Sequence, residues 1–170
     1  MSNETRHLGT ETPMLLGMPI EQTGDAKFLS IISLWQPWAT WIMWGLKPIE
    51  TRTHDKFHNL AGKRIGIHAA KKLDPDWKYH AGRYLSGQTI DKTQNYDHAL
   101  GALICTAYVY DYDRVPHRDS PLALIECETP RFGLFLSKII ALDPPIPMRG
   151  CQGIWTVPVS SLTMQLVASV

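Results

Sequence analysis

Continuous and alternating apolar runs predict a series of strands along the chain. The run FLSIISL at residues 28–34 is apolar and β-branched, which is typical of a buried strand. In PIETRT at 48–53, apolar and polar positions alternate, as they do in a strand with one buried face. The same criteria predict further strands at 64–70, 101–112, 131–142 and 153–160, and DPPIP at 143–147 predicts a break in the chain.

Two segments carry the signals of helix boundaries. Gln36-Pro37 predicts a helix start, because proline fits the first helical position, where its missing N–H costs nothing. Gly45 predicts the end of that helix. Asp74, as N-cap, predicts a second helix over 74–85.

The order of these elements indicates the fold class and the domain boundaries. Several strands, two helices and connections of mixed length indicate an α+β domain with a small barrel-like sheet. The segment 121–128 fits either a strand or a helix. Residues 1–26 are rich in Thr, Glu, Gly and Pro, so we expect an N-terminal extension there and one domain over 27–170.

Composition narrows the class of protein. The sequence is 44% hydrophobic and 19% charged, as in ordinary globular proteins. It has neither the run of roughly 18 apolar residues that a membrane helix needs nor a signal-peptide pattern, so we expect a cytoplasmic protein without membrane contact. The three cysteines form no CxxC pair, and no phosphate-loop or dinucleotide motif is present, so we expect neither a metal site nor a cofactor.

Positive charge is concentrated in one part of the chain. The formal net charge is only +1, yet residues 27–72 contain eight basic and two acidic side chains. Local positive charge attracts phosphates, although a solvated basic face would have the same composition.

Four tryptophans at every third position precede a compact polar group. They are Trp35, Trp38, Trp41 and Trp44. A helix turns about 100° per residue, so the three within the predicted helix cannot share one buried stripe. We expect Trp41 and Trp44 to pack in the core, whereas Trp35 and Trp38 either pack or line a site.

The polar group consists of Lys47, Glu50 and Arg52. Glu50 and Arg52 are two apart on a predicted strand, so they share one face, and Thr51 points to the other face. Lys47 precedes Pro48, which favours an extended backbone at the entry to this strand. The group is either a surface ion pair or the polar floor of a cleft.

These residues resemble the opening of the ASCH domain (activating signal cointegrator homology), whose hallmark is GxKxxExR after an aromatic-flanked helix. Gly45, Lys47, Glu50 and Arg52 match it position for position. Similar blocks follow in order as LAGKRIGIHAAKK, GALICTAYVYDY and PIPMRGCQGIWTVP, so the resemblance spans about residues 28–158.

The resemblance implies a fold, a ligand class and a site. ASCH domains have a PUA-like fold, a small β-barrel flanked by helices, and are associated with RNA binding, so the expected partner is RNA or a small molecule with a nucleobase. The walls of the implied cleft would be Trp35, Gln36 and Trp38, its floor Lys47, Glu50 and Arg52, and further contacts would come from His68, Lys63 and Arg64.

Two alternatives stay open. Some small ASCH proteins are hydrolases of modified nucleosides or reported ribonucleases, and Lys47 with Glu50 would be the acid–base pair. However, the deacylating members carry threonine at the position of Glu50, so the presumed nucleophile is missing here. The second alternative is an interaction protein whose cleft holds a peptide or has lost its role.

Overall fold

The structure is a computed structural model that describes residues 14–15, 18–19 and 27–162. Strands β1 (Met14–Leu15) and β2 (Met18–Pro19) form a short antiparallel pair. The rest of the predicted N-terminal extension and residues 163–170 lie outside the described residues, so the division at residue 27 stays a prediction. No helix in the described part of the chain has the length and apolarity needed to cross a membrane.

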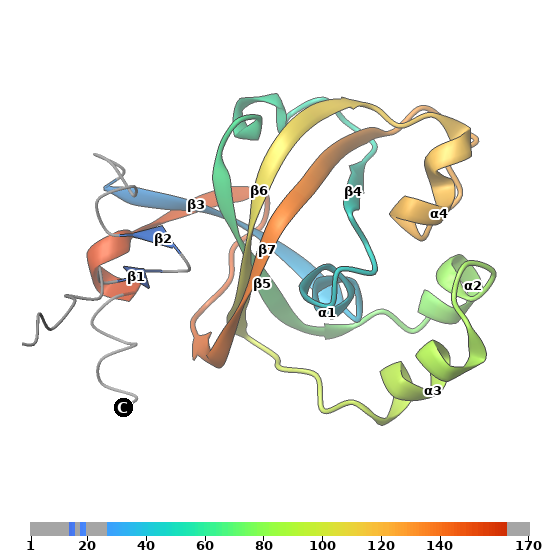
Figure 1. The fold of residues 1–170 in the computed structure, drawn as a ribbon, viewed down its shortest axis with the longest axis horizontal. Helices are drawn as coiled ribbons and strands as arrows, with labels where there is room; N and C mark the ends of the chain where they lie inside the picture. Colours follow the sequence, from blue (N-terminus) through green and yellow to red (C-terminus); the bar gives the residue numbers. More distant parts are fainter. Residues whose placement is uncertain (1–13, 16–17, 20–26, 163–170) are drawn as a thin grey trace, which may run out of the picture.

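A curved six-stranded sheet forms the body of the domain (Figure 1). Its strand order is β4-β7-β6-β5-β3-β8. Strands β3 and β5 pair in parallel, and the other ladders are antiparallel. The bounds are β3 Phe28–Gln36, β4 Ile49–Arg52, β5 Arg64–Leu73, β6 Ala102–Arg114, β7 Phe132–Pro147 and β8 Ile154–Pro158. The fold class is therefore mixed α+β, as predicted, whereas the closed barrel stays a prediction.

Helix α1 (Trp38–Met43) follows β3 directly and ends at the glycine that the sequence pattern indicates. Gly45 has a φ of +73°, a left-handed conformation that favours glycine, and its N–H bonds the Ile42 carbonyl. This reversal leads the chain into β4. Trp41 is fully buried, as predicted, and so is Ile42.

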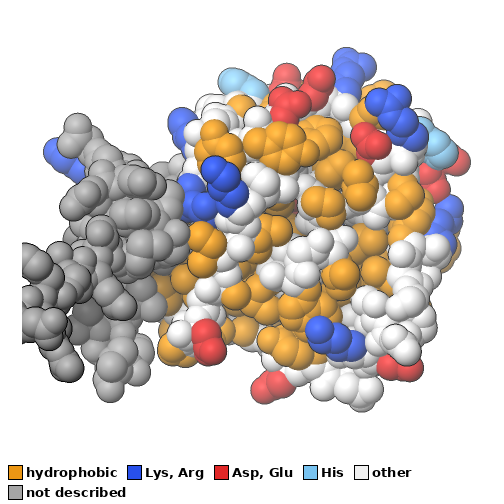
Figure 2. Space-filling view, in the orientation of Figure 1, with side chains coloured by type: hydrophobic (Ala, Val, Ile, Leu, Met, Phe, Trp, Pro, Cys, Tyr) orange, Lys and Arg blue, Asp and Glu red, His pale blue; other side chains and the backbone are white. Residues whose placement is uncertain are grey.

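Within residues 27–162, four more short helical segments lie between the strands. They are η2 (His58–Leu60), α2 (Trp77–Ala81), α3 (Gly87–Asn95) and η3 (His117–Asp119), which runs into α4 (Ser120–Ala123). Figure 1 shows α2, α3 and α4 on the side of the sheet away from β1 and β2. On the face shown in Figure 2, apolar side chains gather in the middle and most charged side chains lie around the edge.

The structure corrects two expectations about elements, decides between two alternatives at a third, and adds one helix. DPPIP does not break the chain, because β7 continues to Pro147. The helix predicted over 74–85 is shorter, and its N-cap is Asp76 rather than Asp74. The chain at 120–123 is helical, and α3 was not predicted at all, since of its residues only Thr93 is buried.

Candidate functional site

Two neighbouring cavities open beside the Lys47–Arg52 strand. The smaller has a volume of about 270 Å³ and is lined by Trp38, Lys47 and Glu50, among others. The larger is a cleft of about 1430 Å³ with His68 in its wall. Ser33, Trp35 and Arg52 line both cavities, so the two adjoin one another, and we call the pair the trough.

The floor of the smaller cavity is a buried ion cluster. Lys47 and Glu50 are 2% and 6% exposed. Lys47 Nζ lies 2.9 Å from Glu50 Oε2 and also donates to the Ile49 carbonyl, while Arg52 Nη2 lies 3.1 Å from Glu50 Oε1. The three groups that the sequence placed together are thus in direct contact, with Glu50 between the two cations.

Burial and charge act against each other in this cluster. Burial lowers the pKa of Lys47, because it disfavours the ammonium. Burial also disfavours the charged form of Glu50, but the charges of Lys47 and Arg52 outweigh it and hold the Glu50 pKa below its ordinary value. Glu50 is therefore a carboxylate at neutral pH.

Tryptophans form part of the walls. Trp38 donates its indole N–H to Asp74 Oδ2 over 2.8 Å, which fixes the ring at the smaller cavity. Trp35 is 44% exposed, and Lys72 Nζ lies 3.6 Å from the centre of its ring. Trp41 lies behind Trp38, edge to face at 5.0 Å, and supports the wall without lining it.

The larger cleft has a strongly basic lining. Its charged lining residues are Arg52, Lys56, Lys71 and Arg149, and none of its described lining residues is acidic. His68 lies in its wall and is 2% exposed. Its Nε2 is 3.2 Å from the Met148 carbonyl, and burial lowers its pKa, so the ring is neutral at neutral pH.

Three residues predicted for the site lie outside both cavities. Gln36 is fully buried, and its amide is engaged by the Ala99 carbonyl and by Thr40, so it holds the start of α1 in place. Arg64 donates to Thr106 Oγ1 and to the Lys138 carbonyl. Lys63 is exposed in the turn before β5.

Several lining residues were not expected from the sequence. Arg131 lies at the smaller cavity and donates from Nε to Thr51 Oγ1 over 3.1 Å. Arg149 and Gly150 reach the larger cleft from the segment between β7 and β8. The only signal for Arg149 and Gly150 was their position inside the fourth block of the resemblance, and nothing in the sequence indicated Arg131.

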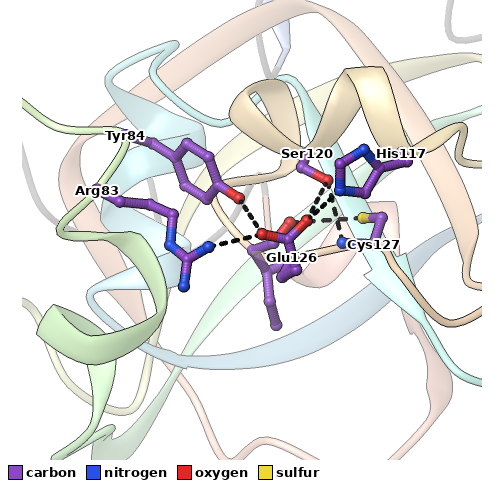
Figure 3. Close-up of polar contacts among 7 residues, drawn as sticks. Arg83, Tyr84, His117, Ser120, Glu126 and Cys127 are labelled. Carbon is purple, nitrogen blue, oxygen red and sulfur yellow. Dashed lines mark hydrogen bonds and ion pairs between the residues drawn. The ribbon is translucent and has the colours of Figure 1, made fainter.

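A separate polar cluster surrounds Glu126 (Figure 3). The carboxylate contacts Arg83 and Tyr84, which follow α2, and His117 and Ser120 near α4. The cluster therefore ties two segments together across the helical side of the domain. His117, Glu126 and Glu128 also offer ligand atoms within 4.8 Å of one another. No second feature points to an ion there, and we assign no metal site.

Comparisons with known proteins found similarity at the level of structure. No family model and no curated protein matches the sequence. The crystal structure of ASCH from Zymomonas mobilis is similar, with a TM-score of 0.53 and 18% identity over 85% of this chain and 96% of that one. Two variants of the same protein give TM-scores of 0.48 and 0.47 at 17% and 16% identity, and cover 85% and 82% of this chain and 97% and 96% of theirs.

The match to the unmodified protein shows that this chain has an ASCH-like fold, as the resemblance of the four sequence blocks predicted. At this level of identity the comparison concerns the fold alone. A function must therefore be argued from the residues of the trough.

Proposed function

We propose that the trough binds single-stranded RNA or a nucleotide, with a base at the tryptophan-walled smaller cavity and phosphates along the larger cleft. The observation that supports the proposal is the lining of the larger cleft, which includes four cationic side chains and, among the described residues, no acidic one. Such a surface attracts a polyanion. A base can enter a pocket only when it is unstacked, as in single-stranded RNA.

Arg52 is suited to hold a phosphate at the junction of the cavities. Its Nη2 is bound to Glu50, which fixes the orientation of the guanidinium. Its Nε is buried and has no hydrogen-bond partner in the described part of the chain. The Arg52 side chain as a whole is 26% exposed, so its accessible guanidinium N–H groups can give a phosphate oxygen charge-assisted hydrogen bonds.

Trp35 is suited to stack a base. Its ring is 44% exposed at the boundary of the cavities. Stacking on an aromatic ring contributes about 1–3 kcal/mol per base with little sequence preference. Lys72 above the ring supplies a cation near the phosphate of a stacked nucleotide.

A hydrolase that uses Lys47 and Glu50 is a second candidate, favoured by the burial that lowers the Lys47 pKa. We rank it below binding, because Nζ already donates to Glu50 and to the Ile49 carbonyl. Liquid chromatography after incubation with N-acylated nucleosides or short RNAs tests this candidate. Turnover that disappears in Lys47→Ala would support it, and equal turnover would exclude this pair from the mechanism.

Filter binding with a mixed-sequence single-stranded RNA tests the proposed function. We expect the affinity to fall as salt rises, because each neutralised phosphate releases counterions. Arg52→Ala should weaken binding and flatten this salt dependence, and Trp35→Ala should weaken binding by about tenfold. Lys63→Ala, an exposed cation outside both cavities, is the matched control. Absence of binding to any RNA at low salt would reject the proposal and favour a protein partner.

A further inference from the structure

Arg131 brings guanidinium donors to the smaller cavity that the protein itself does not use. It directly precedes β7, and its carbonyl accepts the Val115 N–H over 2.9 Å, which holds the backbone in place. Its Nε donates to Oγ1 of the buried Thr51 over 3.1 Å, so one edge of the planar group is fixed by β4. The two terminal nitrogens make no hydrogen bond or ion pair within the described part of the chain, and neither is buried. They are therefore an oriented and accessible pair of donors.

The two carboxylates among the described lining residues of this cavity are already engaged. Glu50 contacts a cation with each of its oxygens. Asp74 accepts the Asp76 N–H at Oδ1 over 2.9 Å and the Trp38 indole N–H at Oδ2 over 2.8 Å. Every carboxylate oxygen thus has a partner, whereas the Arg131 donors have none. A base that accepts hydrogen bonds fits this cavity better than one that donates them.

The shape of the donor pair narrows the choice of base. Two N–H groups on one guanidinium edge match two adjacent acceptors. Guanine has such a pair at O6 and N7, whereas adenine has an amino group beside N7. Cytosine has adjacent acceptors at O2 and N3, but a purine covers more of the Trp35 ring at the boundary of the cavities.

We propose that Arg131 binds O6 and N7 of a guanine in the smaller cavity, and that this contact makes the trough prefer guanine at one position of a bound strand. The inference rests on the proposed function and names the base in its pocket. A phosphate would also fit the donor pair, so the experiment separates the two contacts.

Five RNAs of about 10 nucleotides test the proposal on the unchanged protein. Each is a run of uridines with guanine, hypoxanthine, 7-deazaguanine, adenine or cytosine at one central position. We expect the guanine strand to bind about tenfold more tightly than the adenine strand, the effect of one bidentate contact. Hypoxanthine keeps O6 and N7 and should bind like guanine. The 7-deazaguanine strand lacks the N7 acceptor and should lose most of the preference, and the cytosine strand should bind less tightly than the guanine strand.

A matched pair of variants assigns the preference to one side chain. Lysine keeps the positive charge but is a point donor, so Arg131→Lys should reduce the ratio of guanine-strand to adenine-strand affinity to about one. Arg149→Lys makes the same change in the larger cleft and should leave this ratio at about tenfold. The ratio is the readout, because a general loss of charge or of folding weakens both strands alike.

The outcomes separate the inference from the function on which it rests. If all five strands bind the unchanged protein equally well, or if cytosine binds best, the inference is overturned and the proposed function stands. If Arg131→Lys weakens every strand and keeps the full guanine preference, Arg131 contacts phosphate instead, and the inference is again overturned. If no strand binds at low salt, the proposed function fails and the inference with it.

Discussion

Replacement of Lys47 by methionine should destabilise the domain strongly, because it removes one partner of a buried ion pair. Removal of one partner from such a pair costs about 3–5 kcal/mol, since the remaining charge stays buried. Here Arg52 Nη2 remains 3.1 Å from Glu50 Oε1, so Glu50 keeps one cation. We therefore expect the lower end of that range, about 3 kcal/mol for Lys47→Met.

Urea unfolding at pH 7, followed by tryptophan fluorescence, measures this loss. With a denaturant slope of about 2 kcal/mol/M, the midpoint should fall by about 1.5 M. Lys63→Met is the matched control, because Lys63 is exposed and takes no part in the cluster. Its effect should stay within about 0.5 kcal/mol.

A double variant tests whether the buried charge of Glu50 causes the loss of stability in Lys47→Met. In Lys47→Met/Glu50→Gln the buried carboxylate is gone, so part of the lost stability should return relative to Lys47→Met alone. The reasoning is refuted if Lys47→Met costs no more than Lys63→Met. It is also refuted if Glu50→Gln lowers the free energy of unfolding of the Lys47→Met variant by as much as it lowers that of the wild type.

Three further predictions concern pH, backbone conformation and thiol chemistry. The pKa of Glu50 in the folded state lies below its ordinary value of 4.5, so the contribution of Glu50 to stability is present above pH 4.5 and is lost as pH falls through the lower folded value. Urea unfolding at pH 7 and in this acid range should therefore show a steeper loss of stability in wild type than in Glu50→Gln. Gly45→Ala should cost about 1 kcal/mol in thermal unfolding, because alanine disfavours a positive φ. Burial raises the pKa of Cys105 to about 12, so a thiol reagent at pH 8 should label the exposed Cys151 and leave Cys105 unreacted until urea is added.

A specific experimental result would contradict each of these three predictions. Identical pH dependence in wild type and Glu50→Gln would mean that Glu50 is not held as a carboxylate by its partners. An unchanged melting temperature in Gly45→Ala would mean that the turn does not require glycine. Labelling of Cys105 at the rate of Cys151 in the folded protein would contradict its burial.

The sequence alone determined the local elements whose signals are local. The run at 28–34, the helix start at Pro37 and the glycine at 45 depend on side-chain shape and backbone freedom within a few residues. All three fall at the observed elements. The shared face of Glu50 and Arg52 follows from the two-residue period of a strand, and their ion pair confirms it.

Tertiary contacts overrode local signals in two elements. Pro144 and Pro145 lie where the β6–β7 ladder shifts register between Leu103 and Cys105, so their missing N–H groups fall in an irregular stretch, whereas Pro147 pairs with Ala102 near the end of the ladder. Asp74 has the character of a helix cap, and its Oδ1 does accept the Asp76 N–H, but its Oδ2 accepts the indole N–H of Trp38 from another element. Neither contact is visible from neighbouring residues.

Only the tertiary structure decided which chemical groups face the trough. Gln36 is adjacent to Trp35 in sequence, yet strand alternation turns it away to bind the Ala99 carbonyl. Gly150 reaches His68 and Ser33 only because β3, β5 and the segment after β7 meet in space. Local propensities follow from neighbouring residues, but the convergence of groups as distant in sequence as His68 and Met148, 80 residues apart, depends on how the sheet folds and packs.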